Sequence, residues 1–233
     1  MNQKTIGIIG GMGPLATADL FRKIVTHTQA TCDQDHLHVI IDNNTAIPDR
    51  TAALLRGGED PLPQMQKSAR MLESDGADCL IMPCNTAHFF HAQVQSFVHI
   101  PLLNMLELTC QEMQRRGIRT AGLLATNGTV LTGVYAAVAE KYGITLLTPD
   151  DAGQQAVMDM IYRGVKAGAA VYDTAAVEAA ALRLQQQGAE TMVLGCTELP
   201  LAVEQYHLDF PAIDPTLELA KGAIRFAGGT VLD

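Results

Sequence analysis

Short apolar runs alternate with longer amphipathic segments along the whole chain. The runs are apolar on both faces, which is typical of parallel strands covered on two sides by helices. We expect strands at residues 5–10, 37–42, 79–84, 102–106, 120–126, 144–148, 191–196 and 212–214. We expect helices between them, among them residues 15–27, 63–75, 108–116, 130–142, 152–167 and 174–187. This strict alternation predicts the α/β class.

Four of these helices are followed by a glycine, where a left-handed C-terminal residue is expected: Gly76, Gly117, Gly143 and Gly188. The pattern also repeats. TIGIIGGMG from Thr5 returns as TAGLLATNG 115 residues later, and GADCLIMPCNT from Gly76 returns as GAETMVLGCTE 112 residues later. IPLLNMLEL from Ile100 returns as FPAIDPTLEL 110 residues later. Three repeats in one order predict two α/β halves built from one template.

The expected architecture is therefore two pseudo-symmetric parallel-sheet α/β halves. Residues 1–99 plus 210–233 form the first lobe and residues 100–209 the second. Ligands of open parallel sheets bind beyond the carboxyl ends of the strands. We therefore expect the active site in the cleft between the lobes.

Two cysteines end the repeated strands: Cys84 is followed by Asn-Thr and Cys196 by Thr-Glu. A helix N-terminus at such a junction is expected to lower the thiol pKa. Cys32, Cys79 and Cys110 lack a polar pattern around them and are expected to be buried apolar residues.

Paired thiols can invert a stereocentre, because one removes a proton from one face of a carbon while the other delivers a proton to the opposite face. A catalytic disulfide is the competing chemistry, but redox pairs have local spacing or a resolving partner, and the sequence offers neither.

Composition narrows the function further. The chain has 233 residues, 48% of them hydrophobic, and a formal net charge of −9. This charge argues against a surface for nucleic acid or anionic membrane. The five cysteines include no Cys-x-x-Cys pair, as expected of reduced thiols in the cytoplasm. The N-terminal apolar stretch is too short and glycine-rich for a signal peptide, and no window resembles a transmembrane helix.

Five motifs resemble the aspartate/glutamate racemase superfamily, and in particular its aspartate racemase branch: IGIIGGMGP at 6–14, NNTAIPDRT at 43–51, PCNTAH at 83–88, GVKAG at 164–168 and LGCTELP at 194–200. They span nearly the whole chain in the order of the family. The resemblance implies racemisation of a small acidic amino acid by a two-base mechanism in a homodimer. It implies no cofactor, no pyridoxal phosphate and no metal.

The resemblance also implies roles for single residues. Cys84 and Cys196 match the catalytic thiols. The matching substrate-binding positions are Asn85, Thr86 and Thr197 around the α-carboxylate and ammonium groups, Arg50 and Lys166 as cations associated with an acidic side chain, and Met12 in the first turn. His88 and Glu198 are expected beside the two thiols. Glutamate racemases carry an aspartate where this chain has Gly11-Met12 and a histidine where it has Glu198, which favours aspartate as the substrate.

The residues by themselves leave alternatives open. Arg50 opens a helix, where the dipole disfavours a cation, and this hints at a ligand; Lys166 lies near a helix end, where stability alone would explain it. GMGPLA at 11–16 fits a dinucleotide fingerprint with Asp42 as the ribose-binding acid. His88 and His91 suggest a metal but lack a third ligand.

Other functions also fit. Related reactions on glutamate, hydantoins, malonates or maleate use the same fold, and a two-lobe amino-acid-binding protein without catalysis is the alternative outside enzymes.

Overall fold

Two separate parallel sheets organise the chain in a computed structural model that describes residues 3–232. The described residues divide into two compact units. Unit 1 runs to Met105 and resumes at Thr216, and unit 2 is Leu106–Pro215. Each chain crossing lies six residues beyond the lobe boundary given above. Within residues 3–232, no helix combines the length and apolar character needed to cross a bilayer.

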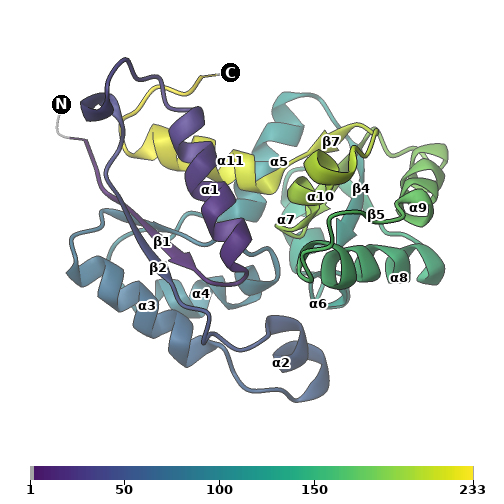
Figure 1. The fold of residues 1–233 in the computed structure, drawn as a ribbon, viewed down its shortest axis with the longest axis horizontal. Coiled ribbons are helices and arrows are strands. Elements are labelled where there is room, and N and C mark those ends of the chain that lie inside the picture. Colours follow the sequence, from purple (N-terminus) through teal and green to yellow (C-terminus); the bar gives the residue numbers. More distant parts are fainter. Residues whose placement is uncertain (1–2, 233) are drawn as a thin grey trace. The chain divides into compact units, whose positions relative to one another are not determined.

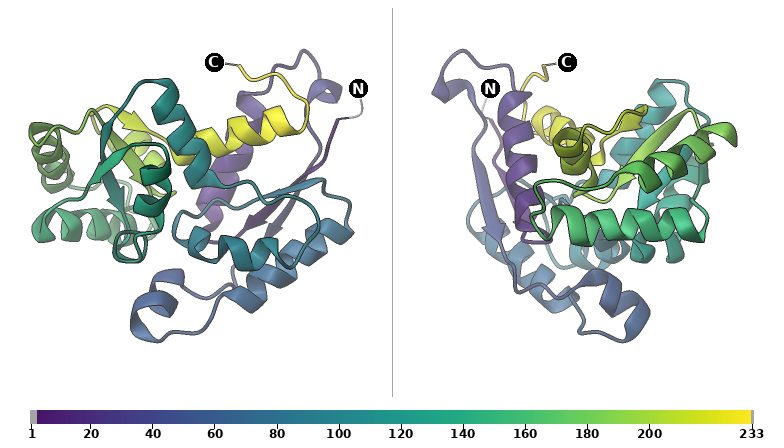
Figure 2. Two further views of the ribbon diagram at one scale, coloured as in Figure 1. Left: turned by 180° about the vertical axis from the view of Figure 1, so that it is seen from behind. Right: turned by 45° about the vertical axis from the view of Figure 1, so that its right-hand side comes forward.

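Unit 1 contains a three-stranded sheet in the order β2-β1-β3. Helices α1 and α11 lie on one face of this sheet, and α3 and α4 lie on the other (Figures 1 and 2). Its elements are β1 (Ile6–Gly10), α1 (Pro14–Thr26), η1 (Asp33–Asp35), β2 (Val39–Asn43), α2 (Arg50–Arg56), α3 (Leu62–Ser74), β3 (Cys79–Ile81), η2 (Thr86–Phe90), α4 (His91–Gln95) and, after unit 2, most of α11 (Pro215–Phe226).

Unit 2 contains a four-stranded sheet in the order β5-β4-β6-β7, with α8 and α9 packed on it (Figure 1). Its elements are β4 (Thr120–Ala125), α6 (Asn127–Leu131), α7 (Val134–Lys141), β5 (Thr145–Leu147), α8 (Asp151–Asp159), the π-helix η3 (Met160–Val165), α9 (Ala175–Gln186), β6 (Thr191–Gly195), α10 (Leu199–Tyr206) and β7 (Ala212–Ile213). Helix α5 (Met105–Arg115) begins with the last residue of unit 1 and continues into unit 2.

The sequence repeat is confirmed by the strand register. Gly7 pairs with Leu80 in unit 1, and Gly122 pairs with Met192 in unit 2. Both pairs keep the offsets of 115 and 112 residues read from the sequence. The next strand position follows the third offset, because Leu80 bridges Leu102 and Met192 pairs with Ala212. The two sheets therefore share their order and register over these positions.

The turn into each repeated strand is also the same. The four glycines expected in left-handed conformation have φ between 67° and 104°, which confirms that prediction. An acidic residue follows two positions after Gly76 and Gly188. Asp78 accepts a hydrogen bond from the backbone N–H of Thr5 at 2.7 Å, and Glu190 accepts one from Thr120 at 3.0 Å. Each carboxylate thus joins two neighbouring strands at their amino ends.

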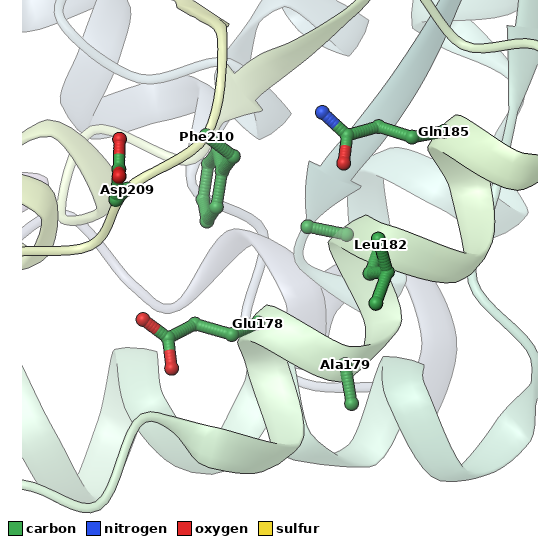
Figure 3. A pocket seen from close by; sticks show the side chains of 7 residues that line it. Glu178, Ala179, Leu182, Gln185, Asp209 and Phe210 are labelled. Atoms are coloured by element: carbon green, nitrogen blue, oxygen red, sulfur yellow. The ribbon is translucent and has the colours of Figure 1, made fainter.

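The repeat breaks down on one helix face. In unit 1 the guanidinium of Arg70 on α3 lies 4.4 Å from the ring centre of Phe97, and Glu73 accepts from the backbone N–H of His99. The corresponding face of α9 leaves a cavity of about 400 Å³. Figure 3 shows Glu178, Leu182 and Gln185 of this helix opposite Asp209 and Phe210. The cavity lies at the amino end of β7.

Several expected elements are wrong in detail. Residues 102–106 form only a bridge at Leu102, because α5 already begins at Met105. The single helix expected at 130–142 is two helices, since Gly133 takes φ 65° between them. The helix expected at 152–167 changes from α to π geometry at Met160. Cys32 is exposed in the loop before η1 and not buried, whereas Cys79 and Cys110 are buried as expected.

Candidate active site

The half-site of unit 1 is built on the turn that follows β3. Cys84 donates its backbone N–H to the carbonyl of Met82 at 2.8 Å, so the chain turns tightly at Pro83. The residue is 7% exposed. Asn85 and Thr86 follow directly and are buried, which keeps the thiol, an amide and a hydroxyl within three consecutive residues at the carboxyl end of the strand.

The side chain of Asn85 has no hydrogen-bond partner among residues 3–232, although both its Nδ2 and its Oδ1 are buried. The residue is 1% exposed. A buried polar group without a partner costs about 1–3 kcal/mol, and native proteins keep such groups for a reason. An amide can both donate and accept, so it suits the ammonium and carboxylate groups of an amino acid. The Asn85 side chain is the strongest indication of a ligand in unit 1.

His88 is bonded at both of its ring nitrogens. Nδ1 lies 2.9 Å from the carbonyl oxygen of Cys84, and the backbone N–H of Met105 points to Nε2 at 3.0 Å. A carbonyl only accepts and an amide N–H only donates, so His88 is neutral with its proton on Nδ1. Burial lowers its pKa to about 4. The expected place of His88 beside Cys84 is through the backbone of that residue.

Met12 and Arg50 are brought together from two loops. Arg50 is the first residue of α2, behind the N-cap Asp49. Its guanidinium turns back and donates to the carbonyl of Pro48 at 2.8 Å and to that of Met12 at 2.9 Å. The glycine beside Met12 has its own explanation: Gly11 has φ 92°, and a Cβ there would overlap the backbone of Asn44. The glycine-rich turn therefore needs no dinucleotide to account for it.

The half-site of unit 2 has a different chemical character. Cys196 directly follows β6, and its Sγ donates to Glu198 Oε2 at 2.9 Å. The other carboxylate oxygen of Glu198 forms an ion pair with Lys166 Nζ. Thr197 Oγ1 lies 3.4 Å from Glu198 Oε2. Cys196, Thr197 and Glu198 are all buried, whereas the Lys166 side chain is 29% exposed.

The π-helix η3 delivers Lys166 to this carboxylate. The backbone N–H of Lys166 donates to Ile161, five residues earlier, which widens the last turn of the helix. Single π-turns of this kind occur frequently at functional sites. Lys166 Nζ also lies 5.9 Å from the ring centre of Tyr162. The expected cation thus lies in unit 2, paired with Glu198.

The thiol of Cys196 does not have the lowered pKa that its place before a helix predicted. Burial raises its pKa well above the ordinary value, and the negative charge of Glu198 raises it further. The charge of Lys166 opposes both effects only in part. Helix α10 begins three residues later at Leu199, too late to outweigh the adjacent carboxylate. At neutral pH, Cys196 is therefore a protonated thiol hydrogen-bonded to a carboxylate.

A polar cavity of about 390 Å³ lies at the carboxyl ends of β4 and β5, between Asn127, Thr148 and Gln154. Gln154 Nε2 donates to the carbonyl of Ala125 and to Asn127 Oδ1, both at 2.9 Å. Its Oε1 is buried without a hydrogen-bond partner in the described part of the chain. Sequence reasoning missed these residues. The signal was available, because Asn127 follows Met12 by the 115 residues of the repeat.

The metal interpretation of His88 and His91 has no geometric support. Their rings stack at 5.7 Å, and His91 Nε2 lies 2.9 Å from the carbonyl oxygen of Leu102. Within residues 3–232, no group of three His, Cys, Asp or Glu side chains is placed to hold a metal ion. The two half-sites thus contain a thiol each, a buried amide without a partner, and a thiol–carboxylate–ammonium chain.

The sequence matches the family of Asp/Glu/hydantoin racemases over residues 9–223. The chain belongs to this family. The matched range includes every site residue described above, from Met12 to Glu198. Family membership places the chain among the isomerases that racemise amino acids and related compounds.

Individual relatives of this racemase family cover nearly the full length of the chain. An aspartate racemase of Picrophilus torridus is 34% identical with a TM-score of 0.83, covering 98% of this chain and 96% of its own. The broad specificity amino-acid racemase RacX of Bacillus subtilis is 28% identical over 232 residues, 94% of this chain and 96% of the relative. A glutamate racemase of Francisella tularensis, solved with D-glutamate, shares the fold at 19% identity and a TM-score of 0.71, covering 97% of this chain and 81% of its own.

Proposed function

We propose that the protein interconverts L- and D-aspartate by a two-base mechanism in which Cys84 and Cys196 act on opposite faces of the α-carbon. The carrying observation is that the repeat places a buried thiol after the same strand in each unit. The strand registers agree between the units, so the two cysteines are equivalent positions of one template. A template used twice, with the reactive group kept in both copies, suits a reaction that needs that group twice.

The proposed reaction balances with these two groups alone. A thiolate takes the α-proton from one face, so that the Cα–H bond breaks and an S–H bond forms. The electron pair left on the substrate is delocalised into its carboxylate. The other thiol delivers its proton to the opposite face and becomes the thiolate. The enzyme leaves each turnover with thiol and thiolate exchanged, and the reverse reaction starts from that state. No pyridoxal phosphate or metal is required by this sequence of steps.

Glu198 has a role in this mechanism. Cys196 is protonated in the free protein, so its proton must leave before it can act as a base. Glu198 Oε2 is the acceptor at 2.9 Å, and Lys166 stabilises the carboxylate from the other side. A positioned carboxylate of this kind contributes about 10²–10⁴-fold to a rate that depends on proton transfer.

The remaining residues are proposed to bind the substrate. Asn85, Thr86 and Thr197 supply amide and hydroxyl groups for the α-carboxylate and ammonium groups. The guanidinium of Arg50 and the turn at Met12 are held together by a hydrogen bond and would bind the side-chain carboxylate. Aspartate is favoured because the relative from Picrophilus torridus, 34% identical over almost the whole chain, is an aspartate racemase.

A second candidate is racemisation of several amino acids, and one observation favours it. Lys166, expected to contact an acidic side chain, is paired with Glu198. A cation already neutralised by a buried carboxylate discriminates less strongly for an anionic substrate. RacX of Bacillus subtilis, a relative of similar length, is a broad specificity racemase.

A chiral assay over the twenty amino acids, without added pyridoxal phosphate or metal, tests the function. Aspartate should give the highest kcat/KM; similar values for neutral amino acids would favour the second candidate. Tight binding without turnover would instead indicate a binding protein. Cys84→Ala and Cys196→Ala should each abolish racemisation, and Cys110→Ala is the matched control because that thiol is buried outside the two turns. Full activity in either active-site variant would remove that thiol from the mechanism.

Deuterium exchange tests the two-base step. In deuterium oxide, L-aspartate should give D-aspartate labelled at the α-carbon, while the remaining L-aspartate stays unlabelled early in the reaction. Early label in the recovered substrate would mean that one base, or a shared proton, serves both faces.

A further inference from the structure

We propose that His88 is a positioning residue that holds the Cys84 turn against the first residue of helix α5. The inference rests on the proposed function for its kinetic consequence, but its geometric part stands independently. His88 contacts the backbone of Cys84 and not its thiol, so it is distinct from the bases of the mechanism.

The hydrogen bonds explain how one side chain can hold both segments. Nδ1–H of His88 donates to the carbonyl oxygen of Cys84 at 2.9 Å. The backbone N–H of Met105 donates to Nε2 at 3.0 Å. Met105 is the first residue of α5, and an N–H in the first turn of a helix has no partner within that helix. His88 therefore satisfies one otherwise unpaired group on each of two segments 21 residues apart in sequence.

The place of Met105 gives this connection its significance. Unit 1 ends at Met105, and α5 carries the chain into unit 2. The imidazole thus joins the turn with the catalytic thiol to the residue at which the chain leaves the unit. Burial keeps the ring neutral, so neither nitrogen changes its role at ordinary pH. A fixed donor–acceptor pair is what a positioning role requires.

The corresponding turn of unit 2 has no such ring. Pro200 follows Cys196 by the same four residues, and a proline can neither donate from its nitrogen nor bridge two segments by a side chain. Unit 2 controls its thiol through Glu198, which contacts Sγ directly. His88 is therefore a device of the Cys84 turn alone, and its loss should leave Cys196 unaffected.

Two isosteric variants separate the two hydrogen bonds. In His88→Asn, the amide nitrogen falls near the place of Nδ1 and can still donate to Cys84. In His88→Gln, the amide oxygen falls near the place of Nε2 and can still accept from Met105, but the bond to Cys84 is lost. Misplacing a reacting group by about 1 Å can reduce a rate about 100-fold. We expect His88→Gln to lower kcat for aspartate roughly 10- to 100-fold with KM within about twofold, and His88→Asn to recover most of that loss.

The matched control is His91→Asn. His91 stacks on His88 and bonds the carbonyl of Leu102, but it does not contact the Cys84 turn. It should keep the wild-type kcat. Equal losses in His88→Asn and His88→Gln, or a wild-type kcat in His88→Gln, would overturn the proposal.

Thiol alkylation tests the geometry without relying on racemisation. Iodoacetamide labelling, followed by peptide mass spectrometry, should show a changed rate at Cys84 in His88→Gln and an unchanged rate at Cys196. Unchanged labelling at both overturns the proposal, even in a protein that racemises. If no amino acid is racemised but the labelling changes at Cys84 alone, the proposed function fails and the positioning role stands.

A measurement on the wild-type protein covers the case in which the variants do not fold. Nitrogen-15 NMR of the histidines should show His88 neutral, with its proton on Nδ1. A proton on Nε2, or an imidazolium at neutral pH, would contradict the hydrogen bonds on which the proposal rests.

Discussion

Replacing Glu198 with glutamine should make Cys196 more acidic and the enzyme slower. The carboxylate oxygen lies 2.9 Å from Sγ, and ionising the thiol would place two negative charges side by side in a buried site. At an effective dielectric constant of about 20, two unit charges about 4 Å apart repel by about 4 kcal/mol. Glu198→Gln removes this repulsion and leaves Lys166 as the nearest charge. The pKa of Cys196 should therefore fall, because its second-largest cause of elevation after burial is gone.

Catalysis should change in the opposite direction. Glutamine cannot take the proton of Cys196 as a carboxylate does, so kcat should fall about 100-fold or more. The thiol titration is measured by thiolate absorbance, or by the pH dependence of Cys196 alkylation, and kcat by the chiral assay. Glu178→Gln, an exposed carboxylate on α9, is the control and should change neither. A Cys196 pKa that rises or stays constant would refute the electrostatic reasoning, and an unchanged kcat would refute the role of Glu198 as proton acceptor.

Three further predictions concern stability. Asn85→Leu removes two buried polar atoms without partners and should raise the free energy of unfolding by about 1–2 kcal/mol while aspartate binding is lost, as measured by denaturant titration and calorimetry. Hydrogen bonding to Arg115 lowers the pKa of Glu112 to about 2, so this carboxylate stabilises the fold above pH 4.5 and the effect disappears as the pH falls toward 2. Glu112→Gln should lose about 2 kcal/mol at neutral pH, after allowance for the exposed arginines, and should flatten the acid part of the stability curve. His88 is neutral when folded and its pKa is lowered from 6.5 to about 4, so stability should decline as the pH falls through that interval, and His88→Asn should remove this slope.

The repeat made much of the fold predictable from sequence. It aligned Gly7 with Gly122 and Leu80 with Met192, and these pairs occur in the same register in both sheets. The reason is physical, because each glycine lies under a leucine of the preceding helix. A Cβ at Gly7 would lie 3.2 Å from Leu72, and one at Gly122 would lie 2.9 Å from Leu184, its counterpart in the repeat. Close packing of this kind limits which residues the strand can carry.

What the sequence could not give depends on contacts between distant residues. The pairing of Lys166 with Glu198 joins positions 32 residues apart, and no local pattern predicts it. The π-turn at Met160 that brings Lys166 there follows from packing, not from propensity. The pKa of Cys196 was misjudged for the same reason, since a helix N-terminus can be read from sequence but the burial of a carboxylate beside the thiol cannot.

The two half-sites began as one template and now control their thiols by different means. The position two residues after the cysteine is Thr86 in unit 1 and Glu198 in unit 2, and the position four residues after it is His88 and Pro200. A buried carboxylate beside both thiols would hold both protonated, because it raises the pKa of each. Placing it beside Cys196 alone allows one thiol and one thiolate to coexist, which is the charge state that a two-base racemisation requires. The difference between the halves is thus a condition of the proposed mechanism, and transplanting it tests this: Thr86→Glu should raise the pKa of Cys84 and slow racemisation, whereas an unchanged Cys84 titration would refute the argument.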